Sequence, residues 1–127
     1  MTTVVDASTV VELLLARIPV QWQSVFDGDI AAPDLVFPEV VSTLRRMLHQ
    51  GMLSAASASV LLDALLDVPI EVVSSRELIQ RAFDFNDRVT VYDGCYVALA
   101  ESLDATLLTA DRRLARTHDL PVRVEML

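Results

Sequence analysis

The amino-acid sequence predicts an α/β fold in which helices cover both faces of a mostly parallel sheet. Short runs rich in Val, Ile and Thr alternate with longer runs whose apolar residues recur every three or four positions. The first pattern indicates strands and the second amphipathic helices, and their alternation along the chain is typical of parallel sheets. With 127 residues, 53% of them hydrophobic and only 3 of them glycine, the chain is long enough to bury a core. We expect a single domain over residues 1–127.

The expected strands are short and lie at residues 2–6, 30–32, 70–73, 106–108 and 121–124, where β-branched and apolar residues gather. The expected helices occupy residues 10–17, 19–26, 38–50, 54–67, 75–83, 90–103 and 112–118. Ser54 and Ser75 are suitable N-caps, and Gly51 is a suitable stop for the helix before it. Thr90, with Asp93 three residues later, resembles a capping box and puts Asp93 in a first helical turn.

Helical spacing also predicts which side chains are buried. The predicted buried positions are Val20, Trp22, Val25 and Phe26 in the second helix, Leu78, Ile79, Ala82 and Phe83 in the fifth, and Tyr92, Cys95, Tyr96, Leu99 and Leu103 in the sixth. Cys95 is the only cysteine, so it forms no internal disulfide, and we expect a core residue. The helix at 54–67 is apolar on more than one side, and we expect part of it to contact another chain.

The charge of the chain limits its partners. A net charge of −8 by itself argues against binding nucleic acid, because phosphate binders are usually basic. However, all ten basic residues are arginines, which suit bidentate phosphate contacts, and several cluster at residues 45–46 and 112–116. For Arg45 and Arg46 the sequence favours a solvated face over phosphate binding. A surplus of acids also suits divalent cations or a basic partner segment.

Nothing in the sequence predicts membrane insertion or export. No apolar run reaches the roughly 18 residues that a membrane span needs. The N-terminus leads to Asp6 without a basic or apolar leader. We expect a cytoplasmic protein without membrane contact.

Four acids stand where strands give way to helices or where helices begin: Asp6, Glu39, Asp93 and Asp111. Ligands of open α/β sheets bind at such ends, so these acids are expected to share a crevice. Clustered carboxylates need a cation to stay ionised, and oxygen ligands without histidine suit Mg²⁺ or Mn²⁺. Such a site serves metal-assisted attack of water on a phosphodiester. The alternative is that each acid only caps its helix.

In four motifs the chain resembles the PIN-domain ribonucleases, and within this family the VapC toxins of bacterial VapBC toxin–antitoxin pairs. The motifs are Val4-Val5-Asp6-Ala7-Ser8, Pro38-Glu39-Val40 followed by Leu44-Arg45-Arg46, Tyr92-Asp93 leading into Ala98-Leu99-Ala100, and Leu108-Thr109-Ala110-Asp111-Arg112-Arg113-Leu114. The resemblance covers essentially the whole chain. It implies an α/β/α sandwich with a roughly five-stranded sheet and Mg²⁺- or Mn²⁺-dependent endoribonuclease activity. It also implies a homodimer, and a complex with a VapB-type antitoxin whose C-terminal tail blocks the site.

Carried over residue by residue, the resemblance implies that Asp6 and Asp93 ligate metal directly while Glu39 and Asp111 complete the site. By the same resemblance, Ser8 and Thr109 support these acids through hydrogen bonds. The chain departs from many relatives at Ser42, where they have asparagine, so a supporting hydrogen bond there is weaker.

Two kinds of surface are expected around these acids. Arg112, Arg113 and Arg116 are candidates for RNA phosphate contacts, with Arg45 and Arg46 as weaker ones. A basic antitoxin segment is expected to enter the acidic crevice, with its apolar anchors on the helices at 10–17 and 54–67.

Other functions fit parts of the same pattern. A non-catalytic, acidic α/β protein-binding module would use the acids only as caps, and a DNA-directed metal-dependent nuclease would use the same metal chemistry. A receiver-type domain needs adjacent acids and a late lysine, and this chain has no lysine. A haloacid-dehalogenase-type phosphatase needs a second acid two residues after Asp6, where Ser8 stands.

Overall fold

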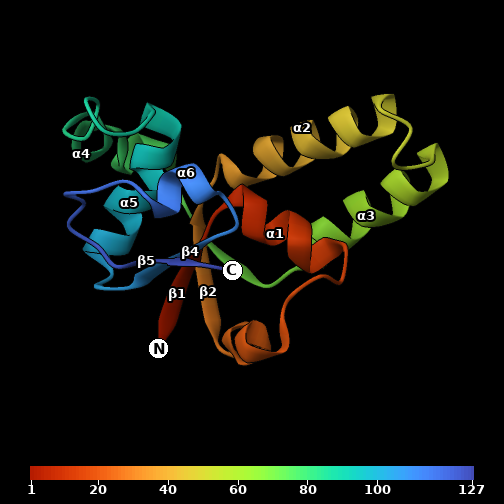
Figure 1. Cartoon of the computed structure of the whole chain (residues 1–127), viewed down its shortest axis with the longest axis horizontal. Coiled ribbons are helices and arrows are strands. Elements are labelled where there is room, and N and C mark those ends of the chain that lie inside the picture. The colour runs from red at the N-terminus through yellow and green to blue at the C-terminus, as the bar shows by residue number, and fades with distance from the viewer.

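A five-stranded, entirely parallel sheet forms the centre of the protein in the computed structural model, which describes all 127 residues (Figure 1). Its strands are β1 (Thr2–Val5), β2 (Asp29–Pro33), β3 (Ile70–Val73), β4 (Thr106–Thr109) and β5 (Val124–Met126), in the spatial order β3-β2-β1-β4-β5. The predicted parallel sheet is thereby confirmed. The fifth strand begins later than predicted because its pairing with β4 starts at Val124, opposite Leu107, and Pro121 has no amide hydrogen to donate.

Helices cover both faces of this sheet, as predicted. They are α1 (Ala7–Leu14), α2 (Val36–His49), α3 (Ala55–Asp67), α4 (Ile79–Phe83), α5 (Val91–Ser102) and α6 (Arg112–Ala115), with 3-10 helices η1 (Val20–Asp27) and η2 (Ser75–Glu77). In Figure 1, α1, α2 and α3 lie on one side of the sheet and α4 and α5 on the other. Right-handed crossovers explain the division, because the chain steps in one direction from β1 to β3 and in the opposite direction from β3 through β4 to β5.

Helix α5 is the central element of the core. Every residue from Gly94 to Ala100 is buried, and the helix contacts β1, β2, β4 and α4. A Cβ atom at Gly94 would lie 2.8 Å from the carbonyl oxygen of Ala82, so glycine allows α4 to approach this closely. Cys95, Tyr96 and Leu99 are buried as predicted.

Several predicted core residues lie at the surface instead. Tyr92, in the first turn of α5, is 66% exposed. Val20 is 78% exposed, and no residue of η1 is fully buried. Trp22, Val25 and Phe26 of η1 are only partly buried. Ile79, Phe83 and Leu103 are exposed, since α4 is a single short turn and Leu103 follows the end of α5.

Helix boundaries also differ from the prediction. Helix α2 begins at Val36, two residues before Pro38, and α1 ends at Leu14 because Ala16 has a φ of 55°. Ser74, rather than Ser75, caps the segment after β3. Helix α6 ends at Ala115, short of residue 118. No helix combines the length and the apolar character that a membrane crossing requires.

Candidate active site

The four acids singled out in the sequence line one pocket of about 360 Å³. Asp6 follows β1 and Asp111 follows β4, which are neighbouring strands of the sheet. From β1 the chain adds strands on one side, and from β4 it adds them on the other, so the strand order reverses between these two strands. Glu39 comes from the first turn of α2 and Asp93 from the first turn of α5. The pocket therefore lies where α/β sheets place their ligands.

Asp6 is held in one orientation by its own turn and by β4. One carboxylate oxygen accepts hydrogen bonds from the Ser8 hydroxyl at 2.6 Å and the Thr9 amide at 3.0 Å. The other accepts from the Thr109 hydroxyl at 2.5 Å. The residue is 6% exposed, and this burial raises the pKa of Asp6 while the three hydrogen bonds oppose the shift.

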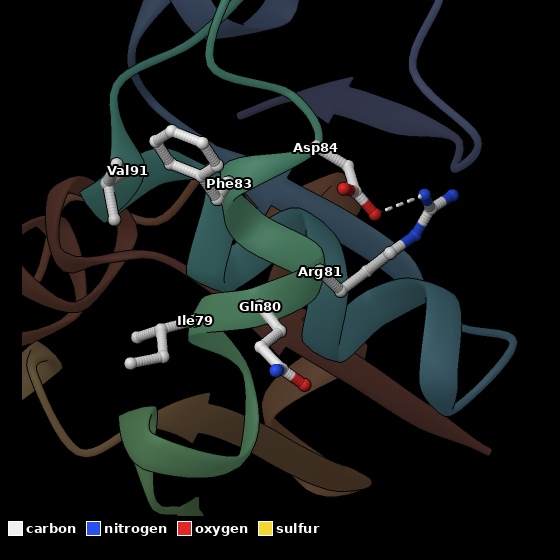
Figure 2. Close-up of a pocket in the computed structure, with 6 residues that line it drawn as sticks. All are labelled: Ile79, Gln80, Arg81, Phe83, Asp84 and Val91. Atoms are coloured by element: carbon white, nitrogen blue, oxygen red, sulfur yellow. Dashed lines mark hydrogen bonds and ion pairs between the residues drawn. The ribbon is translucent and has the colours of Figure 1, made fainter.

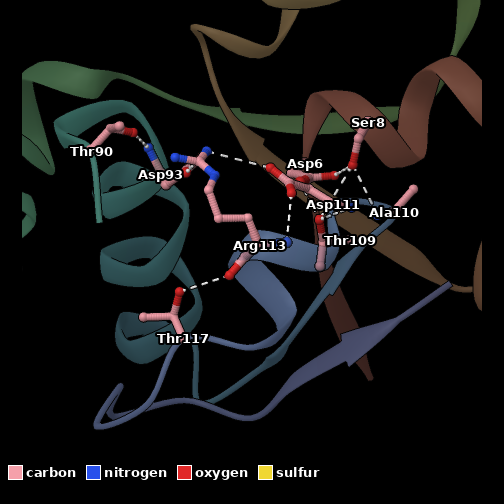
Figure 3. A network of polar contacts seen from close by, with 9 residues as sticks. All are labelled: Asp6, Ser8, Thr90, Asp93, Thr109, Ala110, Asp111, Arg113 and Thr117. Atoms are coloured by element: carbon pink, nitrogen blue, oxygen red, sulfur yellow. Dashed lines mark hydrogen bonds and ion pairs between the residues drawn. The ribbon is translucent and has the colours of Figure 1, made fainter. Parts of the chain in front are cut away.

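Ser8 and Thr109 join the loops that follow β1 and β4 (Figure 3). Their hydroxyl oxygens lie 3.3 Å apart. The amide of Ala110 donates to the Ser8 hydroxyl and the amide of Asp111 donates to Thr109, each at 2.9 Å. The two residues thus lie where a supporting role requires them.

Glu39 accepts a hydrogen bond from a tyrosine that sequence analysis assigned only to the core. The Tyr96 hydroxyl donates to Oε1 of Glu39 at 2.7 Å, although Tyr96 itself is 1% exposed. Burial raises the pKa of Glu39, and the charges of Asp93 and Asp6 raise it further, while the Tyr96 bond lowers it. The sequence contained an indication of this contact, because Tyr96 lies three residues after Asp93 and so on the same face of α5 as this acid.

Asp93 and Asp111 share a cation from the protein itself. One guanidinium nitrogen of Arg113 lies 3.1 Å from Oδ2 of Asp93 and 3.5 Å from Oδ2 of Asp111, and Figure 3 shows its side chain between them. Burial raises the pKa of Asp93 even though Arg113 opposes the shift, and Asp111 and Asp6 add to it. Asp111 also caps α6 by accepting from the Arg113 amide at 2.9 Å.

The donor atoms of the pocket suit a hard divalent cation. Five carboxylates line it, the four predicted ones and Glu12, which sequence analysis did not single out, together with the hydroxyls of Ser8, Thr43 and Tyr96. The lining has no histidine or cysteine, and hard cations such as Mg²⁺ prefer oxygen ligands. As the side chains stand, however, no three acidic, histidine or cysteine groups converge on one point. The contacts of Asp93 and Asp111 with Arg113 account for part of this, because the guanidinium lies beside the oxygens that a metal would use.

The arginine candidates separate into two groups. Arg113 and Arg46 line the pocket, whereas Arg45, Arg112 and Arg116 are exposed and do not line it. Arg46 extends from the same face of α2 as Glu39.

Ser42 does not lie in the pocket. It is exposed and its hydroxyl makes no hydrogen bond to the protein. Thr43, which sequence analysis did not single out, lines the pocket in its place and donates a 3.2 Å bond to the Glu39 carbonyl. Along α2, the positions 39, 43 and 46 face the pocket because they lie on one helical stripe.

A larger depression, about 770 Å³, lies elsewhere on the surface (Figure 2). It is lined by Ile79, Gln80, Arg81, Phe83, Asp84 and Val91. Its only acid, Asp84, pairs with Arg81 at 2.9 Å. Because it gathers no group of acids or nucleophiles, it is not the place where hydrolytic chemistry is expected.

Comparisons with known proteins agree with this geometry. The PIN domain family matches residues 3–120. Ribonuclease VapC1 of Mycobacterium tuberculosis is 35% identical over 97% of this chain and 96% of its own, and Ribonuclease VapC12 of the same organism is 32% identical over 97% of both chains.

Solved structures show the same fold. PAE2754 from Pyrobaculum aerophilum matches 91% of this chain and 83% of its own with a TM-score of 0.68 and 25% identity. VapBC2 from Rickettsia felis, solved bound to a DNA fragment from its promoter, matches 99% of this chain and 98% of its own with a TM-score of 0.64 and 15% identity. With a family match over most of its length and two VapC relatives above 30% identity, the chain belongs to the PIN-domain family and, within it, to the VapC ribonucleases.

Proposed function

We propose that residues 1–127 form a single domain that hydrolyses RNA phosphodiester bonds with Mg²⁺ or Mn²⁺ bound by Asp6 and Asp93, with Glu39 and Asp111 completing the site. The observation that carries this proposal is the meeting of four acids from four separate elements in one pocket. Burial raises the pKa of three of them, Asp6, Glu39 and Asp93, and the charges of neighbouring acids raise the pKa of Glu39 and Asp93 further.

Each part of the site has a role in this proposal. Ser8 and Thr109 orient Asp6, and Tyr96 orients Glu39. Arg46 and Arg113 provide positive charge at the pocket for the phosphate groups of the substrate. When bound, a divalent cation supplies an activated water and neutralises charge that develops on the phosphate.

Cleavage of matched substrates tests the proposal. A labelled single-stranded RNA and a DNA of the same sequence are incubated with the protein in EDTA, in Mg²⁺ and in Mn²⁺. We expect cleavage of the RNA alone, dependent on the metal and abolished in Asp6→Asn. The control is Asp63→Asn, which removes an equal charge from an exposed position on α3 outside the pocket. Preferential cleavage of DNA would support a DNA-directed nuclease instead.

We further propose that a VapB-type antitoxin binds a groove between α1 and α3. The groove is about 490 Å³ in volume, and seven of its eight lining residues are hydrophobic, including Leu14, Leu53 and Val60. Val60 is 66% exposed, so the groove presents apolar surface that a helix of a partner can cover. The net charge of −8 and the acidic pocket suit a basic tail on the same partner.

Binding assays test this partner. The protein encoded beside this chain is expected to bind it and to inhibit RNA cleavage. Val60→Asp should weaken that complex without changing cleavage by the free protein. Binding that is equally strong in Val60→Asp and independent of salt and of metal would contradict a helix in this groove and a basic tail in the acidic pocket.

A homodimer is also proposed, on the resemblance to VapC toxins. Sedimentation equilibrium should then give a mass of twice 14.0 kDa for the free protein. A monomer at micromolar concentration would reject it.

A further inference from the structure

We propose that Arg113 is an internal counter-ion of the metal-free site, which the metal displaces and thereby frees to bind a substrate phosphate. The inference rests on the proposed metal-dependent function and deepens it, because it couples metal binding to phosphate binding through one side chain. Such a residue binds a substrate phosphate only when the metal is bound, whereas a permanent phosphate contact would bind it with or without the metal.

The first observation is the place of the guanidinium. It lies 3.1 Å from Asp93, an acid proposed as a direct metal ligand, and 3.5 Å from Asp111. A metal bound at the Oδ2 atoms of Asp93 and Asp111 would lie beside the guanidinium, and two adjacent cations repel each other. Binding of the metal therefore disfavours the guanidinium at this position.

The second observation is that the side chain is free to leave. Its backbone amide is fixed by the 2.9 Å bond to Asp111, but the guanidinium contacts only the two carboxylates. The side chain is 68% exposed, whereas that of Asp93 is 16% exposed. An exposed arginine loses little by exchanging this ion pair for water or for a phosphate, while a mostly buried carboxylate such as that of Asp93 is stabilised by a cation.

The third observation is that no neighbouring arginine has this position. Arg112, the preceding residue on the same helix, is exposed and makes no ion pair or side-chain hydrogen bond. It carries the same charge but does not touch the acids, which makes it a matched control.

Calorimetric titration with Mg²⁺ alone tests the exchange. Arg113→Gln removes the competing cation, so its Mg²⁺ dissociation constant should be about 2- to 5-fold lower than that of the wild type, the range that a largely exposed ion pair contributes. Arg112→Gln should change the constant less than Arg113→Gln. Arg113→Lys keeps the charge and should lie between the wild type and Arg113→Gln.

A second titration tests the release. The probe is a 2′-O-methyl RNA oligonucleotide, whose modified riboses resist cleavage. In EDTA, wild type and Arg113→Gln should bind it alike, because the wild-type guanidinium is held by the acids. In saturating Mg²⁺, Arg113→Gln should bind it more weakly than the wild type, and its binding should lose about one unit of log–log salt slope.

The outcomes separate this inference from the proposed function. If both proteins bind Mg²⁺ with the same affinity, or if Arg113→Gln weakens oligonucleotide binding equally with and without the metal, the exchange is wrong and the metal site stands. If neither protein binds Mg²⁺, nor Mn²⁺ in the same titration, the proposed metal-dependent function is overturned and the inference falls with it.

Discussion

The Tyr96 hydroxyl donates a 2.7 Å hydrogen bond to Oε1 of Glu39, and this bond connects the buried helix α5 to the first turn of α2 across the acidic pocket. The phenol is almost completely buried, so it reaches the carboxylate from the core side and leaves the other side of the pocket open. Glu39 thereby has a fixed partner although α2 and α5 are far apart in the sequence.

Tyr96→Phe should reduce both stability and activity. Loss of a bond to a carboxylate is expected to lower the free energy of unfolding by about 1–2 kcal/mol. Because the bond lowers the pKa of Glu39, its loss should raise that pKa further and shift the acid limb of the kcat–pH profile upward. Urea denaturation and a pH–rate profile measure both effects. Tyr92→Phe is the control, since Tyr92 is exposed and makes no side-chain hydrogen bond. Equal effects in both variants would contradict a specific role for Tyr96.

Thr109→Val should destabilise the protein in a pH-dependent way. Valine keeps the shape of threonine but removes the hydroxyl that donates to Asp6 and accepts from the Asp111 amide. We expect a loss of about 1–3 kcal/mol at neutral pH, the cost of leaving buried polar groups unpaired.

The sign of the pH dependence follows from Asp6. The bond from Thr109 lowers the pKa of Asp6, so it stabilises the ionised form, and part of the loss should disappear as the pH falls through that pKa. Denaturation curves at several pH values measure this. Thr106→Val is the control, because the side chain of Thr106 on the same strand makes no hydrogen bond. A loss independent of pH would show that packing, rather than the carboxylate, explains the effect.

Asp93→Asn should leave the metal-free protein at least as stable as the wild type at pH 7–8, by about 0.5–2 kcal/mol, the scale of relieving a strained site. Burial raises the pKa of Asp93 above its ordinary 3.8, so its carboxylate begins to destabilise the fold as the pH rises above 3.8, and the full penalty is present once the pH exceeds the raised pKa. The gain of the variant should accordingly shrink as the pH falls toward 4.

Magnesium should act on the two proteins differently. It should raise the Tm of the wild type by mass action and leave Asp93→Asn nearly unchanged. Thermal melts with EDTA and with Mg²⁺ measure this, with Asp63→Asn as a variant of equal charge that should respond to Mg²⁺ like the wild type. If Asp93 were only a helix cap, the asparagine variant would be slightly less stable and magnesium would make no difference.

The adjacent arginines of α2 should differ in their contribution to RNA binding. Arg46 lines the acidic pocket, whereas Arg45 lies against the separate apolar hollow between α2 and α3. In saturating Mg²⁺, Arg46→Ala should flatten the log–log salt dependence of binding to an uncleavable RNA by about one unit, and Arg45→Ala should not. Fluorescence anisotropy at several salt concentrations measures the slopes. Equal slopes for the two variants would assign the phosphate contacts to another surface.

The sequence alone was sufficient to predict the alternation of strands and helices, the parallel sheet and the four acids at the ends of elements. Those features depend on local pattern: β-branched runs such as residues 70–73 favour strands, and a cap such as Thr90 marks where a helix begins. The motifs around Asp6 and Asp111 were also sufficient to identify the resemblance to VapC ribonucleases, which the comparisons confirm.

Tertiary structure decided what no local pattern contains. Tyr96 was predicted as a core residue and Ser42 as a supporting one, yet the first reaches Glu39 and the second faces solvent. Likewise, Arg113 contacts Asp93 only because α6 follows β4 and brings residues 20 positions apart to 3.1 Å. Helical periodicity gives a residue its face but not the neighbour opposite that face. The neighbour depends on the order β3-β2-β1-β4-β5, which brings the ends of β1 and β4 together between the two layers of helices.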